Sequence, residues 1–140
     1  MIRCVTFILA TLLISSCGNM EKKNKSSVYE NYITQKGLQP IDNISNFKLH
    51  DWRSLNNHYL VFSSSQNRSY LVKLSSYCSE LPYAETILVR SKGSGLRPSS
   101  SAIHVIKRGL QQPRPERCPI KSIYLVSKKQ ADEITLLGRS

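Results

Sequence analysis

Two β-prone runs that lead to a cysteine place the strongest constraint on the fold of this chain. The runs His58–Ser63 and Ser69–Ser75 are mainly apolar, and a polar link joins them. Short β-prone runs on either side of a polar turn are typical of a β-hairpin. The sequence therefore predicts two antiparallel strands, with Cys78 just beyond the second.

The second run of this hairpin has two different faces. Tyr70, Val72 and Leu74 alternate with Leu71 and Lys73. Residues two apart in a strand point to the same side of a sheet. Because the two faces differ in polarity, we expect one buried side and one side open to solvent.

The first residues of the chain indicate export. After Arg3, an apolar run at positions 4–14 has the length of a secretory signal core and is too short to span a bilayer comfortably. The sequence ISSC at positions 14–17 then resembles a bacterial lipobox. That resemblance implies cleavage before Cys17 and attachment of lipid to this cysteine.

The lipobox sets an expectation for location. Residues 1–16 would be a lipoprotein signal peptide, and several acyl chains on Cys17 would hold the protein on a membrane. Gly18 stands where the sorting pattern for inner-membrane retention has aspartate, which implies the periplasmic face of the outer membrane in a double-membrane bacterium. An ordinary signal peptide with a coincidental cysteine, or a transmembrane helix, is the alternative.

The segment after the lipidation site predicts a tether and a helix. Residues 17–27 are polar and predict a flexible tether, and residues 28–140 predict a single domain. Val28–Lys36 has apolar residues at helical spacing. Ser27 and Glu30 suit a capping box at the start of this helix, and Gly37 suits its C-terminal cap.

Export also simplifies the pairing of the four cysteines. Cys4 leaves with the signal peptide and Cys17 takes lipid, so Cys78 and Cys118 remain in an oxidising compartment. A disulfide between them closes a loop of about 40 residues, worth roughly 4 kcal/mol in the chain-entropy account. A redox or metal-binding pair is the alternative, although the chain has no CxxC motif and no histidine adjacent to either cysteine.

The remaining segments complete an α+β fold. Strands outside the hairpin are predicted at Ile44–His50, Ile87–Arg90, Ala102–Lys107 and Ile120–Val126, and a closing helix at Lys128–Leu137, capped by Ser127. Their short connections favour antiparallel pairing. We expect a small antiparallel sheet or partly closed barrel of about six strands, with an N-terminal and a C-terminal helix.

Two further features bear on possible binding surfaces. Trp52, the only tryptophan, lies close to a predicted turn at Asn56-Asn57. Such a residue is usually buried with its indole N–H bonded to a carbonyl, and a stacking platform is the functional alternative. The segment Ser91–Ser101 is rich in glycine and serine, which predicts a mobile loop.

The spacing of several of these features resembles one family. They are Trp52, the tyrosine-led strand 70–74 before Cys78, and the sequence CPIKSI at 118–123. Together they are similar to domain of unknown function 6491, a family of small bacterial envelope proteins, over roughly residues 28–136. The resemblance implies a fold, a cysteine pair and an envelope setting, and no catalytic residue carries over from it.

A strong basic excess indicates an anionic partner or a merely soluble surface. The chain has a net charge of +11, and without Arg3 it keeps 19 basic against 9 acidic residues. Such an excess favours nucleic acid, anionic lipid or acidic glycan. The basic residues are scattered, which argues against nucleic acid. The candidate anionic contacts in the loops and strand ends are Lys92, Arg97, Lys107, Arg108, Arg114 and Arg117.

The sequence contains no recognisable catalytic or cofactor motif. The histidines are His50, His58 and His104, and their spacing fits no local metal site. There is no GxSxG and no phosphate-binding glycine loop, so no metal or cofactor is predicted. An enzyme with a dispersed site would need two histidines to meet a carboxylate, such as Asp42, Asp51 or Glu85, in one pocket.

These observations favour a non-enzymatic envelope lipoprotein that acts as a binding or structural module. Its expected partners are the membrane, through the lipid on Cys17, and an envelope protein, a glycan or an anionic lipid. A periplasmic enzyme with a dispersed histidine and carboxylate site is the alternative.

Overall fold

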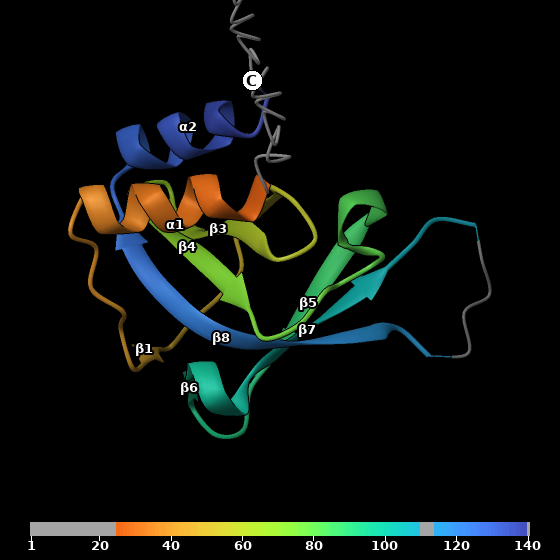
Figure 1. Ribbon diagram of the computed structural model, residues 1–140. Coiled ribbons are helices and arrows are strands. Elements are labelled where there is room, and N and C mark those ends of the chain that lie inside the picture. The colour runs from red at the N-terminus through yellow and green to blue at the C-terminus, as the bar shows by residue number, and fades with distance from the viewer. Residues whose placement is uncertain (1–24, 110–113, 140) are drawn as a thin grey trace, which may run out of the picture.

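The computed structural model describes residues 25–109 and 114–139 (Figure 1). The expectations for the signal peptide, for Cys17 and for most of the tether fall outside these residues. The main elements in chain order are α1 (Lys25–Gln35), β1 (Ile44–Ser45), β2 (Asp51–Ser54), β3 (Tyr59–Ser65), β4 (Arg68–Leu74), η1 (Leu81–Tyr83), β5 (Thr86–Arg90), β6 (Gly95–Leu96), η2 (Pro98–Ser100), β7 (Ala102–Ile106), β8 (Glu116–Val126) and α2 (Lys128–Leu137).

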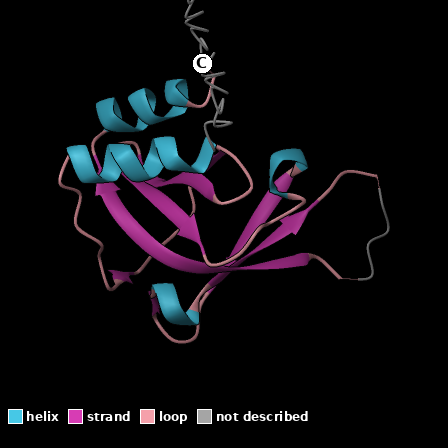
Figure 2. Cartoon of the chain, viewed as in Figure 1, coloured by secondary structure: helices cyan, strands magenta, loops and turns pink. Residues whose placement is uncertain are grey.

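The strands form one curled antiparallel sheet with a small addition. Its order is β2-β3-β4-β8-β7-β5, and β1 pairs separately with β6. β8 is shared, because its C-terminal half pairs with β4 and its N-terminal half with β7. The two helices lie together on one side of the sheet (Figure 2). The predicted α+β fold, a six-stranded antiparallel sheet with an N-terminal and a C-terminal helix, is confirmed.

The central hairpin is tighter than its sequence predicts. Phe62 pairs with Tyr70, and the strands continue until only Gln66 and Asn67 form the turn. The expected solvent-exposed side is wrong for this part of the sheet. Leu71 is fully buried, because the helices cover the face that it shares with Lys73.

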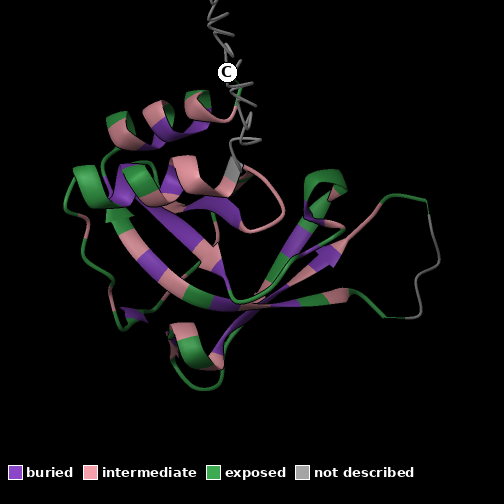
Figure 3. Cartoon of the chain, in the orientation of Figure 1, coloured by how far each residue is buried: buried purple, intermediate pink, exposed green. Residues whose placement is uncertain are grey.

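Two apolar clusters lie on opposite faces of the sheet, and they define its sides. The inner face carries the larger cluster, which includes Leu60, Phe62, Val72 and Ile103. The outer face carries the second cluster, which lies under α1 and α2. Buried and exposed residues therefore alternate along β5 and β8 (Figure 3).

Helix α1 packs its aromatic residues onto the outer face, as predicted. Tyr29 and Tyr32 are buried there, and the ring of Tyr29 lies 5.1 Å from that of Tyr59. The helix starts at Lys25, inside the predicted tether, so Ser27 lies within the helix and the predicted capping box is wrong. Glu30 instead accepts hydrogen bonds from Lys73 and from the hydroxyl of Tyr59.

The predicted helix ends are otherwise confirmed. Gly37 has φ +60°, a left-handed conformation that favours glycine after a helix. Ser127 accepts from the backbone N–H of Gln130, whose side chain accepts from the N–H of Ser127, so α2 begins with a capping box. No helix in the described residues is long and apolar enough to cross a membrane.

Three segments differ from expectation. The strand predicted at Ile44–His50 ends at Ser45, because Asn46 takes a left-handed conformation with φ 53° and turns the chain. β2 follows and has no apolar alternation that would have marked it. The supposed mobile loop 91–101 contains β6 and η2, because Leu96 is buried in the inner core.

Candidate functional site

The predicted cysteine pair is present as a disulfide. Cys78 follows β4, Cys118 lies in β8, and their Cα atoms are 5.8 Å apart. The two residues are 0% and 2% exposed. Because the sulfurs are bonded to each other and shielded from solvent, the bond ties the end of the hairpin to β8.

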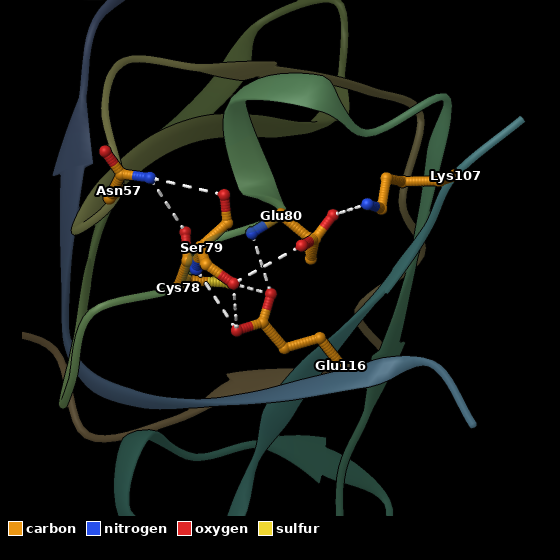
Figure 4. Close-up of polar contacts among 6 residues, drawn as sticks. All are labelled: Asn57, Cys78, Ser79, Glu80, Lys107 and Glu116. Atoms are coloured by element: carbon orange, nitrogen blue, oxygen red, sulfur yellow. Dashed lines mark hydrogen bonds and ion pairs between the residues drawn. The ribbon is translucent and has the colours of Figure 1, made fainter. Parts of the chain in front are cut away.

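The turn after Cys78 is held by a carboxylate from β8. Glu116 accepts from the backbone N–H of Ser79 at 3.1 Å and from that of Glu80 at 2.8 Å (Figure 4). On the other side, the Asn57 side chain donates to the carbonyl of Cys78 at 3.1 Å. These bonds satisfy the polar groups of the turn, so this corner has a structural role.

The three histidines do not meet. His50 is exposed beside a groove next to β2, and the ring of His58 lies 5.6 Å from that of Tyr77. His104 lies in β7, directly opposite Leu88. The groove beside His50 contains neither His58 nor His104, so it does not bring two histidines to a carboxylate.

The six predicted anionic contacts fall into separate groups. Lys107 forms an ion pair with Glu80, and Arg108 forms one with Glu85. The other four are exposed: Lys92 and Arg97 flank β6, Arg114 precedes β8, and Arg117 lies in β8. A cation that is already paired is less available to a partner. Of the four that remain, Arg117 is the one that lies in a strand of the six-stranded sheet.

That surface is the part of the outer face that the helices leave uncovered. Leu88, His104 and Arg117 lie side by side across β5, β7 and β8. The next row contains Arg90 and Pro119, on either side of the buried Ala102. Because Ile103 and Cys118, the neighbours along each strand, point into the inner core, these rows face outward.

Arg90 and Arg117 both lie close enough to His104 to act on its pKa. Burial lowers the pKa of His104, and the positive charges of Arg90 and Arg117 lower that pKa further. The imidazole is therefore neutral at pH 7 and lies between two fixed cations. Toward α1 the row of charges continues with Lys121, which contributes to lowering the pKa of Glu30 after the larger effects of its hydrogen bonds.

We call Arg90, His104, Arg117 and Lys121 the basic face. No outward position of β5, of β7 or of β8 from 117 to 121 is acidic. The ion pairs among the residues that the structure describes involve Lys73, Lys107 and Arg108, and none involves the basic face. Its cations are thus exposed, unpaired and close to one another.

The sequence prediction found one of these cations by its loop position and missed the other two. Arg90 and Arg117 are far apart in the chain, and only the pairing of both strands with β7 brings them together. The available signal was the strand spacing in 86–90 and 102–106. It puts Arg90 on the face opposite Ile87 and Val89, and His104 on the face opposite Ile103 and Val105.

Comparison with known proteins gives one match. The profile of a family described as "Family of unknown function (DUF6491)" covers residues 1–135. No curated protein and no solved structure matched the chain.

Proposed function

Because the chain belongs to the DUF6491 family, whose function is unknown, we propose a function from its own residues: an envelope lipoprotein that acts as a non-enzymatic binding module. The lipobox at 14–17 supports the anchor. The buried Cys78–Cys118 disulfide is in keeping with an oxidising compartment outside the cytoplasm.

The basic face supports one class of partner, anionic lipid headgroups. It is the one observation that carries the proposal, because three cations on an outward sheet face have no ion pair among the described residues. The carboxylate near Lys121, that of Glu30, is paired with Lys73. A Lys or Arg near an anionic membrane surface contributes about 1 kcal/mol. Arg90, Arg117 and Lys121 together would then contribute about 3 kcal/mol, which is weak for a free protein.

The anchor makes such a weak contact effective. A lipid on Cys17 would keep the domain close to the membrane, so that headgroup binding becomes an intramolecular step at high local concentration. α1, the first element after the tether, lies on the same side of the sheet as the basic face, since Lys121 acts electrostatically on Glu30. The cations would therefore orient the domain on the surface to which it is tethered.

Headgroup binding can be measured apart from the anchor. Full-length protein in a neutral detergent is titrated with a soluble short-chain phosphatidylglycerol, with phosphatidylcholine of the same chain length and with inorganic phosphate. We expect binding of phosphatidylglycerol that weakens from roughly 0.05 to 0.5 M salt. The variant Arg90→Ala/Arg117→Ala should bind about 30-fold more weakly, at about 1 kcal/mol per charge.

A charge-matched control separates the basic face from net charge. Lys48→Ala/Arg68→Ala removes two exposed cations elsewhere and should leave binding unchanged. Equal affinity for phosphatidylcholine, or equal losses in the two double variants, would contradict headgroup binding by this face. Equal affinity for inorganic phosphate would identify a phosphate site in place of a lipid site.

The anchor has its own test. Cys17→Ser should abolish incorporation of labelled fatty acid and leave uncleaved precursor. Normal labelling and processing of this variant would refute the lipoprotein assignment, whatever the result for the basic face.

A further inference from the structure

His104 is the member of the basic face whose charge can change near neutral pH. It lies on the outward side of β7, directly opposite Leu88 in β5 and Arg117 in β8. Arg90 lies two residues beyond Leu88 on the same side of β5. The imidazole is half-buried and both arginines are exposed. A titratable ring is thus flanked by two guanidinium groups.

The strands around His104 present cations and uncharged residues on this side of the sheet. The outward positions are Thr86, Leu88 and Arg90 in β5, Ala102 and Ile106 in β7, and Arg117, Pro119 and Lys121 in β8. Beyond the strand ends, Arg108 follows β7 and Arg114 precedes β8. Every charged residue in this set is basic.

The carboxylates near these strands are bonded to other groups. Their ion pairs are Glu30–Lys73, Glu80–Lys107 and Glu85–Arg108. Glu116, next to Arg117 in sequence, accepts instead from backbone N–H groups of the turn after Cys78. His104 itself has no hydrogen bond or ion pair with any of the described residues. An anion that binds from outside is therefore the group that would stabilise the imidazolium.

In the free protein these surroundings favour the neutral ring. Burial lowers the pKa of His104 most, and the charges of Arg90 and Arg117 lower this pKa further. A phosphate bound between the two arginines would offset their charges and add a negative charge beside the ring, so it would raise the pKa of His104. A proton that is held more tightly in the complex must in turn strengthen the binding of the phosphate.

We propose that the basic face binds anionic headgroups together with a proton on His104, so that acidic conditions strengthen its contact with the membrane. This inference rests on the function proposed above and adds a regulator to the same site. Protonation gives the face a fourth cation. One more cation near an anionic surface corresponds to about a fivefold gain in affinity, the equivalent of about 1 kcal/mol.

The pH dependence of headgroup binding tests the coupling. Full-length protein in neutral detergent is titrated with short-chain phosphatidylglycerol at fixed salt, from about pH 7.5 to about pH 5, a range that includes the ordinary histidine pKa of about 6.5. The phosphodiester of this lipid keeps one negative charge over this range, so the protein is the partner that titrates. We expect an affinity about fivefold higher at the acidic end. Calorimetry in two buffers of different ionisation enthalpy should show that binding takes up protons.

Variants at position 104 assign the proton to this ring. His104→Gln removes the titration, so the variant should lack the gain at acidic pH and show no proton uptake. His104→Arg fixes the additional charge, so it should bind about fivefold more tightly than the native protein near pH 7.5 and gain little on acidification. The matched control His50→Gln changes an exposed histidine beside the groove at β2 and should keep the full pH dependence.

The outcomes separate this coupling from the proposed function. Equal affinity of the native protein at both ends of the pH range would overturn the coupling and leave headgroup binding in place. A gain at acidic pH that persists in His104→Gln would also overturn it, because another group would then take up the proton. The absence of phosphatidylglycerol binding at every pH, with circular dichroism showing folded protein, would refute both the coupling and the proposed function.

Discussion

Replacing Gly138 with alanine tests the packing between the end of α2 and α1. Gly138 has φ −78° and ψ −9°, a conformation open to any residue. Alanine would therefore normally stabilise the protein by about 0.4–1 kcal/mol by restricting the unfolded chain. Here, however, a Cβ atom at Gly138 would lie 2.3 Å from the hydroxyl oxygen of Tyr29. Because Tyr29 is 1% exposed and tightly packed, we expect a loss of about 1–3 kcal/mol instead.

The companion variant Tyr29→Phe removes the obstacle. The next atom of the ring, Cζ, lies 3.6 Å from the added Cβ, which is an ordinary contact. The hydroxyl is buried and has no hydrogen-bond partner among the described residues, so its removal should raise the free energy of unfolding by about 1 kcal/mol. In the Tyr29→Phe background, Gly138→Ala should then stabilise the protein by about 0.4–1 kcal/mol.

A double-mutant cycle measures this change of sign. Urea unfolding of the four proteins, followed by circular dichroism, gives the free energies of unfolding, and equal m-values show that they are comparable. We expect a coupling energy of about 2 kcal/mol between positions 29 and 138. Stabilisation by Gly138→Ala with Tyr29 intact, or a coupling below about 0.5 kcal/mol, would refute the reasoning.

Three further predictions concern other contacts. Cys78→Ala/Cys118→Ala should lower the free energy of unfolding by about 4 kcal/mol. Reduction of the disulfide in the native protein should have the same effect. A loss below about 1 kcal/mol in either case would contradict the loop-closure argument. A hydrogen bond from Lys73 is the largest effect that lowers the pKa of Glu30. The ionised Glu30 therefore stabilises the folded protein above the usual carboxyl pKa, and this stabilisation is lost as pH falls through the lowered pKa. In Glu30→Gln, the urea midpoint of unfolding should fall less steeply as pH is lowered. An unchanged fall would contradict this role of Glu30. Burial raises the pKa of Tyr32 to about 12. The neutral Tyr32 therefore contributes its full stabilisation of the folded protein below about pH 10, and this contribution is lost as pH rises toward 12. In Tyr32→Phe, the free energy of unfolding should fall less as pH rises toward 12. An equal fall in this variant would show that the loss has another origin.

Local patterns were enough to predict much of the fold. The hairpin follows from two β-prone runs around a polar link, and α2 follows from Ser127 and the apolar spacing behind it. The Cys78–Cys118 pair followed from the other cysteines being assigned to export. Each of these inferences uses residues close in sequence or a count of one residue type.

The errors have a common physical cause, which is that faces are assigned by tertiary packing. Leu71 and Lys73 looked like a solvent-exposed pair, but α1 covers them and Glu30 pairs with the lysine. β2 at the sheet edge lacks an apolar face of its own. Likewise, Arg90 and Arg117 become neighbours only through β7, and no local pattern in the sequence contains that pairing.

The shared strand β8 has a consequence for the order in which this chain folds. The β3–β4 hairpin and the β5–β7 pair join residues near in sequence and can form early. β8 joins the two units and comes from near the end of the chain, so the sheet closes by slow, non-local pairing. Until β8 docks, both β4 and β7 present open edges, and Cys78 has no partner. A chain that is incompletely synthesised or cleaved before Glu116 would therefore contain two partial sheets with unpaired edge strands. Other chains could add strands to these edges, which would promote aggregation.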